Sequence, residues 1–396
     1  MREIVRIKDL KDMLKKTGEI HGDKPAYKLK TKEPGVYKII THREFRNMVD
    51  ALGTALINMG LKDKRVAVIG ENRYEWEVDY LSVACGTGTI VPFDKALPEN
   101  EVRSLIERSS VEAIFFSNKY AEMMERIKSD GVGNLKYFIS MDLEKADDKF
   151  LSHHELIEEG FKLLEGGDRR FLDAEIDPEV MNIMLFTSGT TAMSKVVALS
   201  HKNLCSNLMD IATVIDVTPD DVMLSFLPLH HIFECTVGFL FALYSGATVC
   251  FSDGPRAMIE NLNEYKITFM ASVPAIYEMI YFKYILKRLE KEGRLEQFKA
   301  DLEKYASSTM EEKAEAFQYI RDMIGGKLRY LISGAAALDP NVEKAYRAAG
   351  LNMLQGYGLT ETAPIAALTP EFDPRVGSAG KAVNCAELRI DSPNEK

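Results

Sequence analysis

The stretch Leu185–Leu199, LFTSGTTAMSKVVAL, places four hydroxyl side chains and a glycine in a row between two apolar runs. Hydroxyl residues suit a buried strand poorly, because their side chains compete with the ladder for backbone hydrogen bonds. A loop of this composition offers backbone N–H groups and hydroxyls to an anion, and Lys195 adds a positive charge at its end. The stretch predicts two strands joined by a phosphate-binding loop made of Thr187, Ser188, Gly189, Thr190 and Thr191.

This loop is not a P-loop, which needs a second glycine before the lysine and Ser or Thr after it. Here Ser194 precedes the lysine and Val196 follows it. Taken alone, such a stretch is more often a polar hairpin tip than a binding site, because short motifs match by chance. Other segments therefore have to decide its function.

The composition is that of a soluble globular protein. The chain has 396 residues, of which 46% are hydrophobic and 28% charged, and its length suggests about two or three domains. Acidic residues outnumber basic ones 60 to 50, giving a net charge of -10 without a long Lys/Arg block, so we expect no nucleic-acid partner. The widely spaced cysteines favour reduced thiols and a cytoplasmic location: Cys85, Cys205, Cys235, Cys250 and Cys385.

The distribution of apolar residues along the chain does not suggest a membrane protein. Residues 1–16 alternate charged and apolar side chains, which is not the pattern of a signal peptide. The most apolar stretches, 237–251 and 269–285, are interrupted by polar residues, Gly246 and Pro274, so we expect no transmembrane helix.

Short apolar runs alternate with amphipathic ones along the chain, which predicts a parallel α/β sheet with helices on its faces. The acidic, glycine-containing stretch 165–178 is the best boundary, and we divide the chain into subdomains 1–172 and 173–396. An insertion at 277–324 repeats Leu295, Phe298 and Leu302 at helical spacing and predicts a solvated helical hairpin with a break near Ser307.

Two further segments favour a nucleotide site. Residues 333–338, SGAAAL, follow an apolar run, and their small side chains would let a flat ring lie close to the backbone. Residues 355–362, QGYGLTET, offer the aromatic ring of Tyr357, the hydroxyl of Thr360 and the carboxylate of Glu361, an oxygen ligand that Mg²⁺ accepts.

With these motifs in order, the chain resembles the adenylate-forming superfamily of acyl-CoA synthetases, nonribosomal peptide synthetase adenylation domains and luciferases. The resemblance rests on TSGTTAMSK, the Pro228–His231 segment, SGAAAL, YGLTE and VGSAGKAVNCAELRI. The helical insertion, LPLHHIFE and SVPAIYE look most like the long-chain fatty acyl branch. The resemblance implies two stacked, mostly parallel sheets and the start of a small distorted β-barrel, as in the large N-terminal domain of such enzymes.

The resemblance also implies a reaction and its residues. A fatty acid would be activated by ATP to an acyl-AMP and passed to CoA, with Mg²⁺ bound at Glu361. Lys195, Thr360, Glu361 and His231 would be catalytic, with His231 near the acyl carboxylate. The remaining predicted contacts to the nucleotide are the loop residues 187–191 together with Gly334, Ala335, Ala336, Tyr357 and Gly358.

Several alternatives stay open at this point. His230 and His231 could ligate a metal with Glu234 or Cys235, although no second ligand cluster supports this. Alternatively, the role of His231 could be limited to supporting a helix start after Pro228. The acceptor could be a carrier protein instead of CoA, and a homodimer or a peripheral membrane contact is open.

The chain departs from the family pattern in two ways. Ala192 and Val196 stand where the family has glycines, so a non-catalytic nucleotide- or lipid-binding relative is a third alternative. The family's ribose-binding aspartate and small C-terminal domain do not follow Lys396. We therefore expect these residues alone to bind ATP and to be a poor catalyst.

Overall fold

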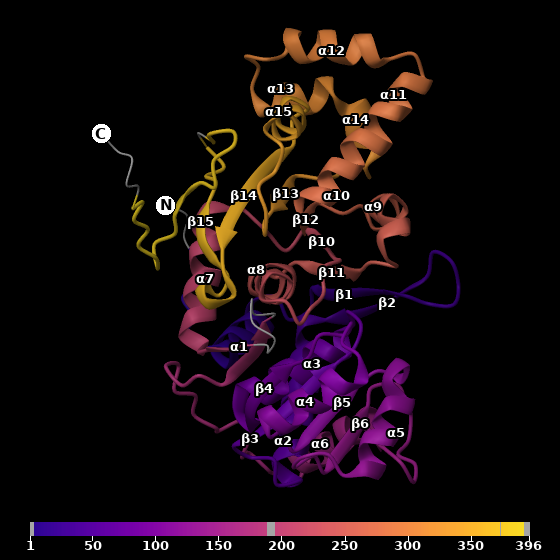
Figure 1. The fold of residues 1–396 in the computed structure, drawn as a ribbon, viewed down its shortest axis with the longest axis vertical. Helices are drawn as coiled ribbons and strands as arrows, with labels where there is room; N and C mark the ends of the chain where they lie inside the picture. Colours follow the sequence, from indigo (N-terminus) through magenta and orange to yellow (C-terminus); the bar gives the residue numbers. More distant parts are fainter. Residues whose placement is uncertain (1–3, 188–194, 373, 392–396) are drawn as a thin grey trace.

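The structure is a computed structural model that describes residues 4–187, 195–372 and 374–391. Its strands form two sheets, one of seven and one of nine strands, with helices on their faces (Figure 1). Most neighbouring strands are parallel, and the antiparallel pairs are β1–β2, β8–β9, β14–β15 and β15–β16. The predicted α/β class with mostly parallel sheets is confirmed.

The seven-stranded sheet lies in the lower part of Figure 1 and has the order β7-β6-β5-β3-β4-β8-β9. Its strands are β3 (Lys64–Ile69), β4 (Gly88–Pro92), β5 (Ala113–Phe116), β6 (Tyr137–Ser140), β7 (Leu151–Ser152), β8 (Ile183–Thr187) and β9 (Lys195–Leu199).

The nine-stranded sheet has the order β16-β15-β14-β13-β12-β10-β11-β1-β2. Its strands are β1 (Pro25–Lys30), β2 (Tyr37–Thr41), β10 (Val222–Ser225), β11 (Thr248–Phe251), β12 (Phe269–Ser272), β13 (Tyr330–Ser333), β14 (Asn352–Gly358), β15 (Ile365–Leu368) and β16 (Lys381–Ala382).

Successive side chains of a strand point to opposite faces of its sheet, and the two faces pack against different layers of the structure. In β5, Phe115 belongs to the core cluster that lies between the two sheets, whereas Phe116 packs in an outer cluster. In β13, Ile332 joins the same central cluster and Leu331 the outer cluster of the second sheet. Because successive strand residues point to opposite faces, both sheets are covered on two sides and share one central core.

Helices of the central layer contribute to that shared core, and two of them begin with a capping box. The hydroxyls of Thr41 and Ser200 accept from the backbone N–H of Glu44 and Asn203, whose side chains accept from the cap N–H in return. The layer contains α1 (Leu10–Ile20), α2 (His42–Asn58), α3 (Tyr74–Ser82), η1 (Val83–Thr87), α6 (His153–Glu165), α7 (His201–Val214), η3 (Glu234–Leu240) and α8 (Phe241–Ser245).

The outer layers differ in size. The seven-stranded sheet carries α4 (Glu99–Ser109), η2 (Asn118–Tyr120) and α5 (Ala121–Asp130). The nine-stranded sheet carries a longer series: η4 (Pro255–Ala257), α9 (Met258–Tyr265), α10 (Pro274–Glu278), η5 (Met279–Leu286), α11 (Lys287–Lys291), α12 (Leu295–Lys304), α13 (Met310–Ala316), α14 (Gln318–Met323) and α15 (Pro340–Ala348).

The predicted insertion at 277–324 is helical, but it is a run of helices from α10 to α14 instead of a simple hairpin, and α11 to α14 lie at the top of Figure 1. The break near Ser307 is present, because Thr309 caps α13. Phe298 is buried, and Leu295 and Leu302 pack against the same outer cluster, as their spacing predicts.

Strand pairing does not follow the predicted division at residues 172 and 173. Strands β8 and β9 extend the first sheet through the β4–β8 pair, while β1 and β2 join the second sheet through β11. Which strands pair depends on how the chain folds in space, and a change in local composition along the sequence does not determine it. Where a small β-barrel was expected to begin, β14, β15 and β16 form an edge of the nine-stranded sheet, because β14 pairs with β13 first and with β15 after Gln355.

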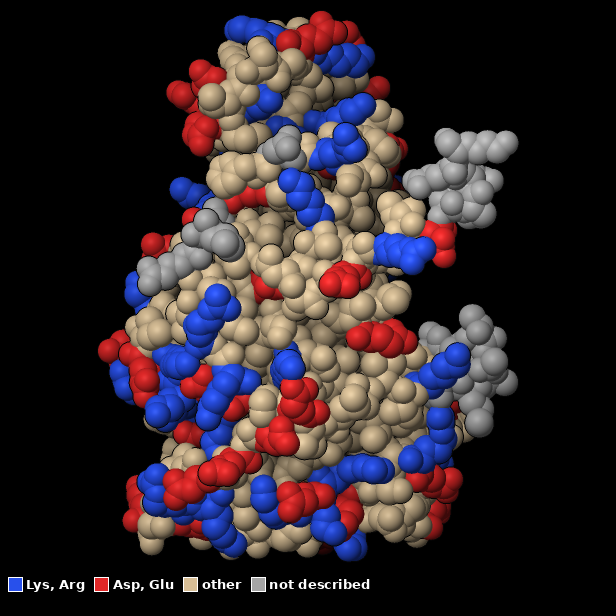
Figure 2. Space-filling model, turned by 90° about the vertical axis from the view of Figure 1, so that its left-hand side faces the viewer, with Lys and Arg blue, Asp and Glu red and all other residues tan. Residues whose placement is uncertain are grey.

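Charges of both signs are interspersed on the face shown in Figure 2. All five cysteines are free thiols, and only Cys385 is exposed. Within the residues that the structure describes, no helix has the length and apolarity needed to cross a bilayer.

Candidate functional site

The segment YGLTET forms the end of β14 and the short turn η6 (Thr360–Thr362). A Cβ atom at Gly358 would lie 1.6 Å from the carbonyl oxygen of Pro364, so no larger residue fits there. The tight return of the chain leaves the ring of Tyr357 51% exposed at the sheet edge. The sequence thus presents an aromatic ring and the Thr360 hydroxyl on one short segment.

A cavity of about 380 Å³ adjoins this segment. Its walls bring together six residues that the motifs predicted from distant parts of the chain: His231, Gly334, Ala335, Tyr357, Gly358 and Thr360. Most of the other lining residues are apolar: Leu227, Pro228, Ile232, Phe233, Val273, Gly356, Leu359, Pro364 and Ile365. The cavity therefore combines a few polar groups with a largely apolar wall, as ligand sites usually do.

The loop after β13 forms one wall of the cavity. Gly334 is buried, and a Cβ atom there would come within 3.0 Å of the Phe233 ring. Ala335 has a φ of 70°, a left-handed conformation that is rare for alanine and often marks a functional site. Ala336 is exposed and is not among the lining residues, so the structure does not bring it into the cavity.

Buried hydrogen bonds hold this wall in register with β14. The Gln355 side chain accepts from the N–H of Leu338 at 3.3 Å and donates to the carboxylate of Glu343 at 2.7 Å. The same carboxylate oxygen accepts from the N–H of Gly377 at 2.9 Å. One buried network thus fixes the loop after β13, helix α15 and the segment around Gly377.

His231 lies exposed at the cavity, at the end of a turn in which its N–H donates to the Pro228 carbonyl at 3.0 Å. Its carbonyl accepts from the N–H of Cys235, so it also supports a helix start. His230 points elsewhere, with Nε2 3.3 Å from a carboxylate oxygen of Asp94, and burial lowers its pKa to about 4. Only the second histidine of the pair faces the site.

Glu234 lies beneath this turn and is fully buried. Burial raises its pKa to about 8, although the Ser225 hydroxyl donates to its carboxylate at 2.7 Å. Cys235 is buried beside Tyr80. Among the described residues, no three or more His, Cys, Asp or Glu side chains are grouped to hold a metal ion, which contradicts the alternative of a metal site at the two histidines.

The hairpin of β8 and β9 lies beside the η6 turn. Thr187 pairs with Lys195 across the hairpin, and β9 packs beside η6, which carries Thr360 and Glu361. Lys195 and Glu361 are both exposed. The predicted loop residues Ser188, Gly189, Thr190 and Thr191, and Ala192 after them, lie outside the described residues.

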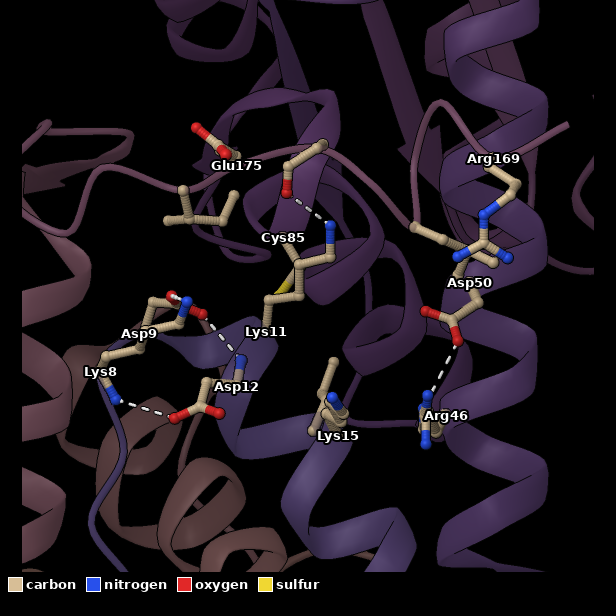
Figure 3. A pocket seen from close by; sticks show the side chains of 14 residues that line it. Lys8, Asp9, Lys11, Asp12, Lys15, Arg46, Asp50, Cys85, Arg169 and Glu175 are labelled. Carbon is tan, nitrogen blue, oxygen red and sulfur yellow. Dashed lines mark hydrogen bonds and ion pairs between the residues drawn. The ribbon is translucent and has the colours of Figure 1, made fainter.

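A larger cavity lies elsewhere, at about 680 Å³ between α1, α2 and residues 169–176 (Figure 3). Several of its charged groups are partnered within the protein. Lys11 donates to the carbonyls of Phe171 and Ala174 at 2.6 and 2.7 Å, and Arg46 pairs with Asp50 at 3.5 Å. None of the predicted site residues that the structure describes lines it, so its size does not make it the candidate site.

Sequence reasoning missed the apolar part of the cavity wall. Leu227, Phe233 and Val273 carry no chemical signal in a sequence, because an apolar residue next to a strand end usually belongs to the core. The signal that could have found Leu227 and Val273 was position, since each lies just after a strand of the sheet whose ends form the site, where α/β folds bind ligands.

A family model described as AMP-binding enzyme matches residues 14–396. The chain belongs to this AMP-binding enzyme family. Long-chain-fatty-acid–CoA ligase 5 of Rattus norvegicus is 27% identical over 385 residues, which cover 90% of this chain and 55% of that protein. The peroxisomal long chain acyl-CoA synthetase 6 of Arabidopsis thaliana is 26% identical, covering 90% and 52%. The chain thus spans about half the length of these relatives.

Two solved structures share the fold. An anthranilate CoA ligase in complex with anthranoyl-AMP aligns with a TM-score of 0.74 at 18% identity, covering 98% of this chain and 66% of that one. A long-chain-fatty-acid-CoA ligase from Archaeoglobus fulgidus aligns with a TM-score of 0.73 at 17% identity, covering 97% and 71%. At these identities the likeness shows the fold of the AMP-binding family alone.

Proposed function

We propose that the protein activates a long-chain fatty acid with ATP to an acyl-AMP and then forms the thioester with CoA. The observation that carries the proposal is the cavity in which the predicted nucleotide residues meet an apolar wall. Membership of the AMP-binding family and the names of the relatives support the same reaction.

The chemistry explains why such a site needs cationic and hydroxyl groups. A carboxylate is a poor electrophile, because its carbon is shielded by negative charge and its leaving group would be oxide. When a carboxylate oxygen attacks the α-phosphate of ATP, the bond to the β-phosphate breaks and pyrophosphate leaves. The acyl carbon then carries AMP as its leaving group in place of oxide, and negative charge is concentrated in the transition state. Lys195, Thr360 and the 187–191 loop would stabilise this charge electrostatically.

The residues present fit a nucleotide. The half-exposed ring of Tyr357 offers a face for the adenine, and Ala335 and Gly358 carry little or no side chain that would obstruct it. Ala336 would contact the base only from outside the cavity lining. His231 faces the cavity where the acyl carboxylate would be presented, beside the apolar residues that suit an acyl chain.

A magnesium ion fits Glu361 as a partner of the nucleotide. A single exposed carboxylate is too little for a protein cage, but Mg²⁺ is commonly held by one or two carboxylates plus substrate phosphates. When bound, the ion would neutralise phosphate charge. Glu361 would hold it beside Thr360 on the η6 turn.

Free, mostly buried thiols fit a reducing compartment, and we propose the cytoplasm as the place of the reaction. A homodimer and a peripheral membrane contact belong to the same proposal.

The experiment is ATP–pyrophosphate exchange with the full protein across fatty acids of short, medium and long chain, followed by CoA or an acyl carrier protein as acceptor. We expect exchange that is greatest with long chains and thioester formation with CoA. Exchange without CoA-thioester formation, but with loading of the carrier protein, would favour a carrier-loading enzyme. Absence of both ATP binding and exchange at millimolar ATP would refute adenylation and favour a non-catalytic relative.

A further inference from the structure

Asn207 is a buried side chain on α7 that none of the proposed chemistry uses. It is 1% exposed and makes three hydrogen bonds to the backbone that follows the YGLTE motif. Its Nδ2 donates to the carbonyls of Ile365 at 2.8 Å and Thr362 at 3.3 Å, and its Oδ1 accepts from the Ile365 N–H at 3.1 Å. Two carbonyls and one N–H define the orientation of the amide.

The backbone that Asn207 contacts has an unusual conformation. Ala363 has a φ of 65°, in the left-handed region that alanine rarely adopts. Such conformations persist only where the surroundings fix them. The bonds from Asn207 lie on both sides of Ala363, and the hydroxyl of Thr236 donates to the Ala363 carbonyl at 3.2 Å. Side chains from α7 and η3 therefore hold the turn in place.

Helix α7 is joined directly to the strand that carries Lys195. Strand β9 ends at Leu199, and Ser200 caps α7 with a reciprocal hydrogen-bond pair to Asn203. One helical turn after Asn207, Asp210 accepts from the N–H of Cys385 at 2.6 Å. The helix is thus bound at its start to the phosphate-loop hairpin and along one face to the segments that follow β14.

We infer that Asn207 is a positioning residue, which fixes the η6 turn relative to β9 so that Thr360 and Glu361 face the same phosphates as Lys195. This inference rests on the proposed adenylation. Lys195 and Glu361 lie on separate segments, and a charge interaction in a transition state depends on their separation. A misplacement of about 1 Å costs up to about a hundredfold in rate.

The test compares Asn207→Ala with Asn207→Asp, which keeps an oxygen to accept from the Ile365 N–H but loses both N–H donors. The control is Asn261→Ala. Asn261 is a fully buried asparagine on α9, which accepts from the Asp253 N–H at 2.9 Å and donates to its carboxylate at 2.7 Å. It lines neither cavity described above, so it reports the cost of losing a buried amide alone.

We expect both Asn207 variants to lose about tenfold to a hundredfold in kcat for fatty-acid-dependent pyrophosphate exchange. The KM for ATP should change less, because Tyr357 precedes the displaced turn. The Ile365 amide should exchange its hydrogen faster in Asn207→Ala, as it loses its acceptor. Asn261→Ala should lower the melting temperature comparably and leave kcat and this amide unchanged.

The outcomes separate the two proposals. Unchanged protection of the Ile365 amide, or an unchanged kcat with an active parent, would overturn the role of Asn207. An equal loss of kcat in Asn261→Ala would reduce it to a contribution to folding. A parent that shows no exchange with any fatty acid would overturn the proposed function, whatever the amide protection shows.

Discussion

At the scale of single residues, Glu361 is the most direct test of the catalytic proposal. Loss of its charge in Glu361→Gln should lower the adenylation rate by about a hundredfold to a thousandfold, since removing one transition-state charge interaction costs about 2.7 to 4 kcal/mol. The side chain is exposed, so the melting temperature should not change. The measurement is pyrophosphate exchange over a range of Mg²⁺ concentrations, with the exposed Glu311→Gln on α13 as control. Unchanged turnover with an unchanged Mg²⁺ dependence would contradict the assignment.

Tyr357 tests the adenine site by affinity instead of rate. Tyr357→Ala should weaken ATP binding by about 1 to 3 kcal/mol through the loss of stacking, whereas Tyr357→Phe keeps the ring face and should bind nearly as the parent does. Calorimetric titration of ATP into the three proteins measures the difference. Equal affinities in all three would show that the exposed ring does not contact the nucleotide.

At the scale of elements, a strand can be read from the sequence more easily when its residues are continuously apolar. Residues 113–116, AIFF, form β5 and show such a run, because a strand buried on both faces is apolar throughout. Strands β1 and β2 were missed because PAYKLK and YKIIT lie at a sheet edge and mix polar with apolar side chains. The pairing of β1 with β11, more than 200 residues away, has no local signal in the chain.

The same distinction applies to the site. Motif residues such as Tyr357 and Thr360 could be found from their chemistry and order in the sequence, and the structure brings them to one cavity. Asn207 could not, because it is an ordinary polar residue on an amphipathic helix until its partners, 155 and 158 positions further along the chain, are known. Apolar wall residues are hidden for a similar reason, since burial alone does not separate a wall from a core.

The η3 element makes a prediction about pH. The pKa of Glu234 is raised from 4.5 to about 8 by burial, so between these values the folded state holds a proton that the unfolded state has lost. Its contribution to stability therefore falls as pH rises from about 5 to 8, at about 1.4 kcal/mol per pH unit. Glu234→Gln removes this contribution. As pH rises through this range, the unfolding free energy of the variant should therefore increase relative to that of the parent by about the same amount per pH unit.

Urea unfolding of the parent and Glu234→Gln at several pH values between these limits measures the slope. The exposed Glu311→Gln serves as control and should follow the parent in parallel, because it removes an exposed carboxyl and keeps the buried carboxyl of Glu234. A constant difference between the parent and Glu234→Gln would show that the carboxyl at η3 is ionised across the range.

At the scale of the whole molecule, the two sheets form one structural unit with a shared core. The central core cluster contains β-strand residues of both, among them Phe115 from the first sheet and Leu354 from the second. Strand exchange adds to this, since β1 and β2 precede the first sheet in sequence but belong to the second. Separating the sheets would expose a large apolar area, which costs about 25 cal/mol per Å².

We therefore expect one cooperative unfolding transition instead of two. The single tryptophan, Trp76 on α3, is 1% exposed in the shared core, and its fluorescence should report the same denaturant midpoint as far-UV circular dichroism, which follows the helices and strands of both sheets. Residues 1–172 expressed alone should show no cooperative transition, because they lack β8 and β9 and leave the edge of β4 unpaired. Two separated midpoints, or cooperative unfolding of residues 1–172, would show that the sheets are independent domains and that the predicted boundary is physically real.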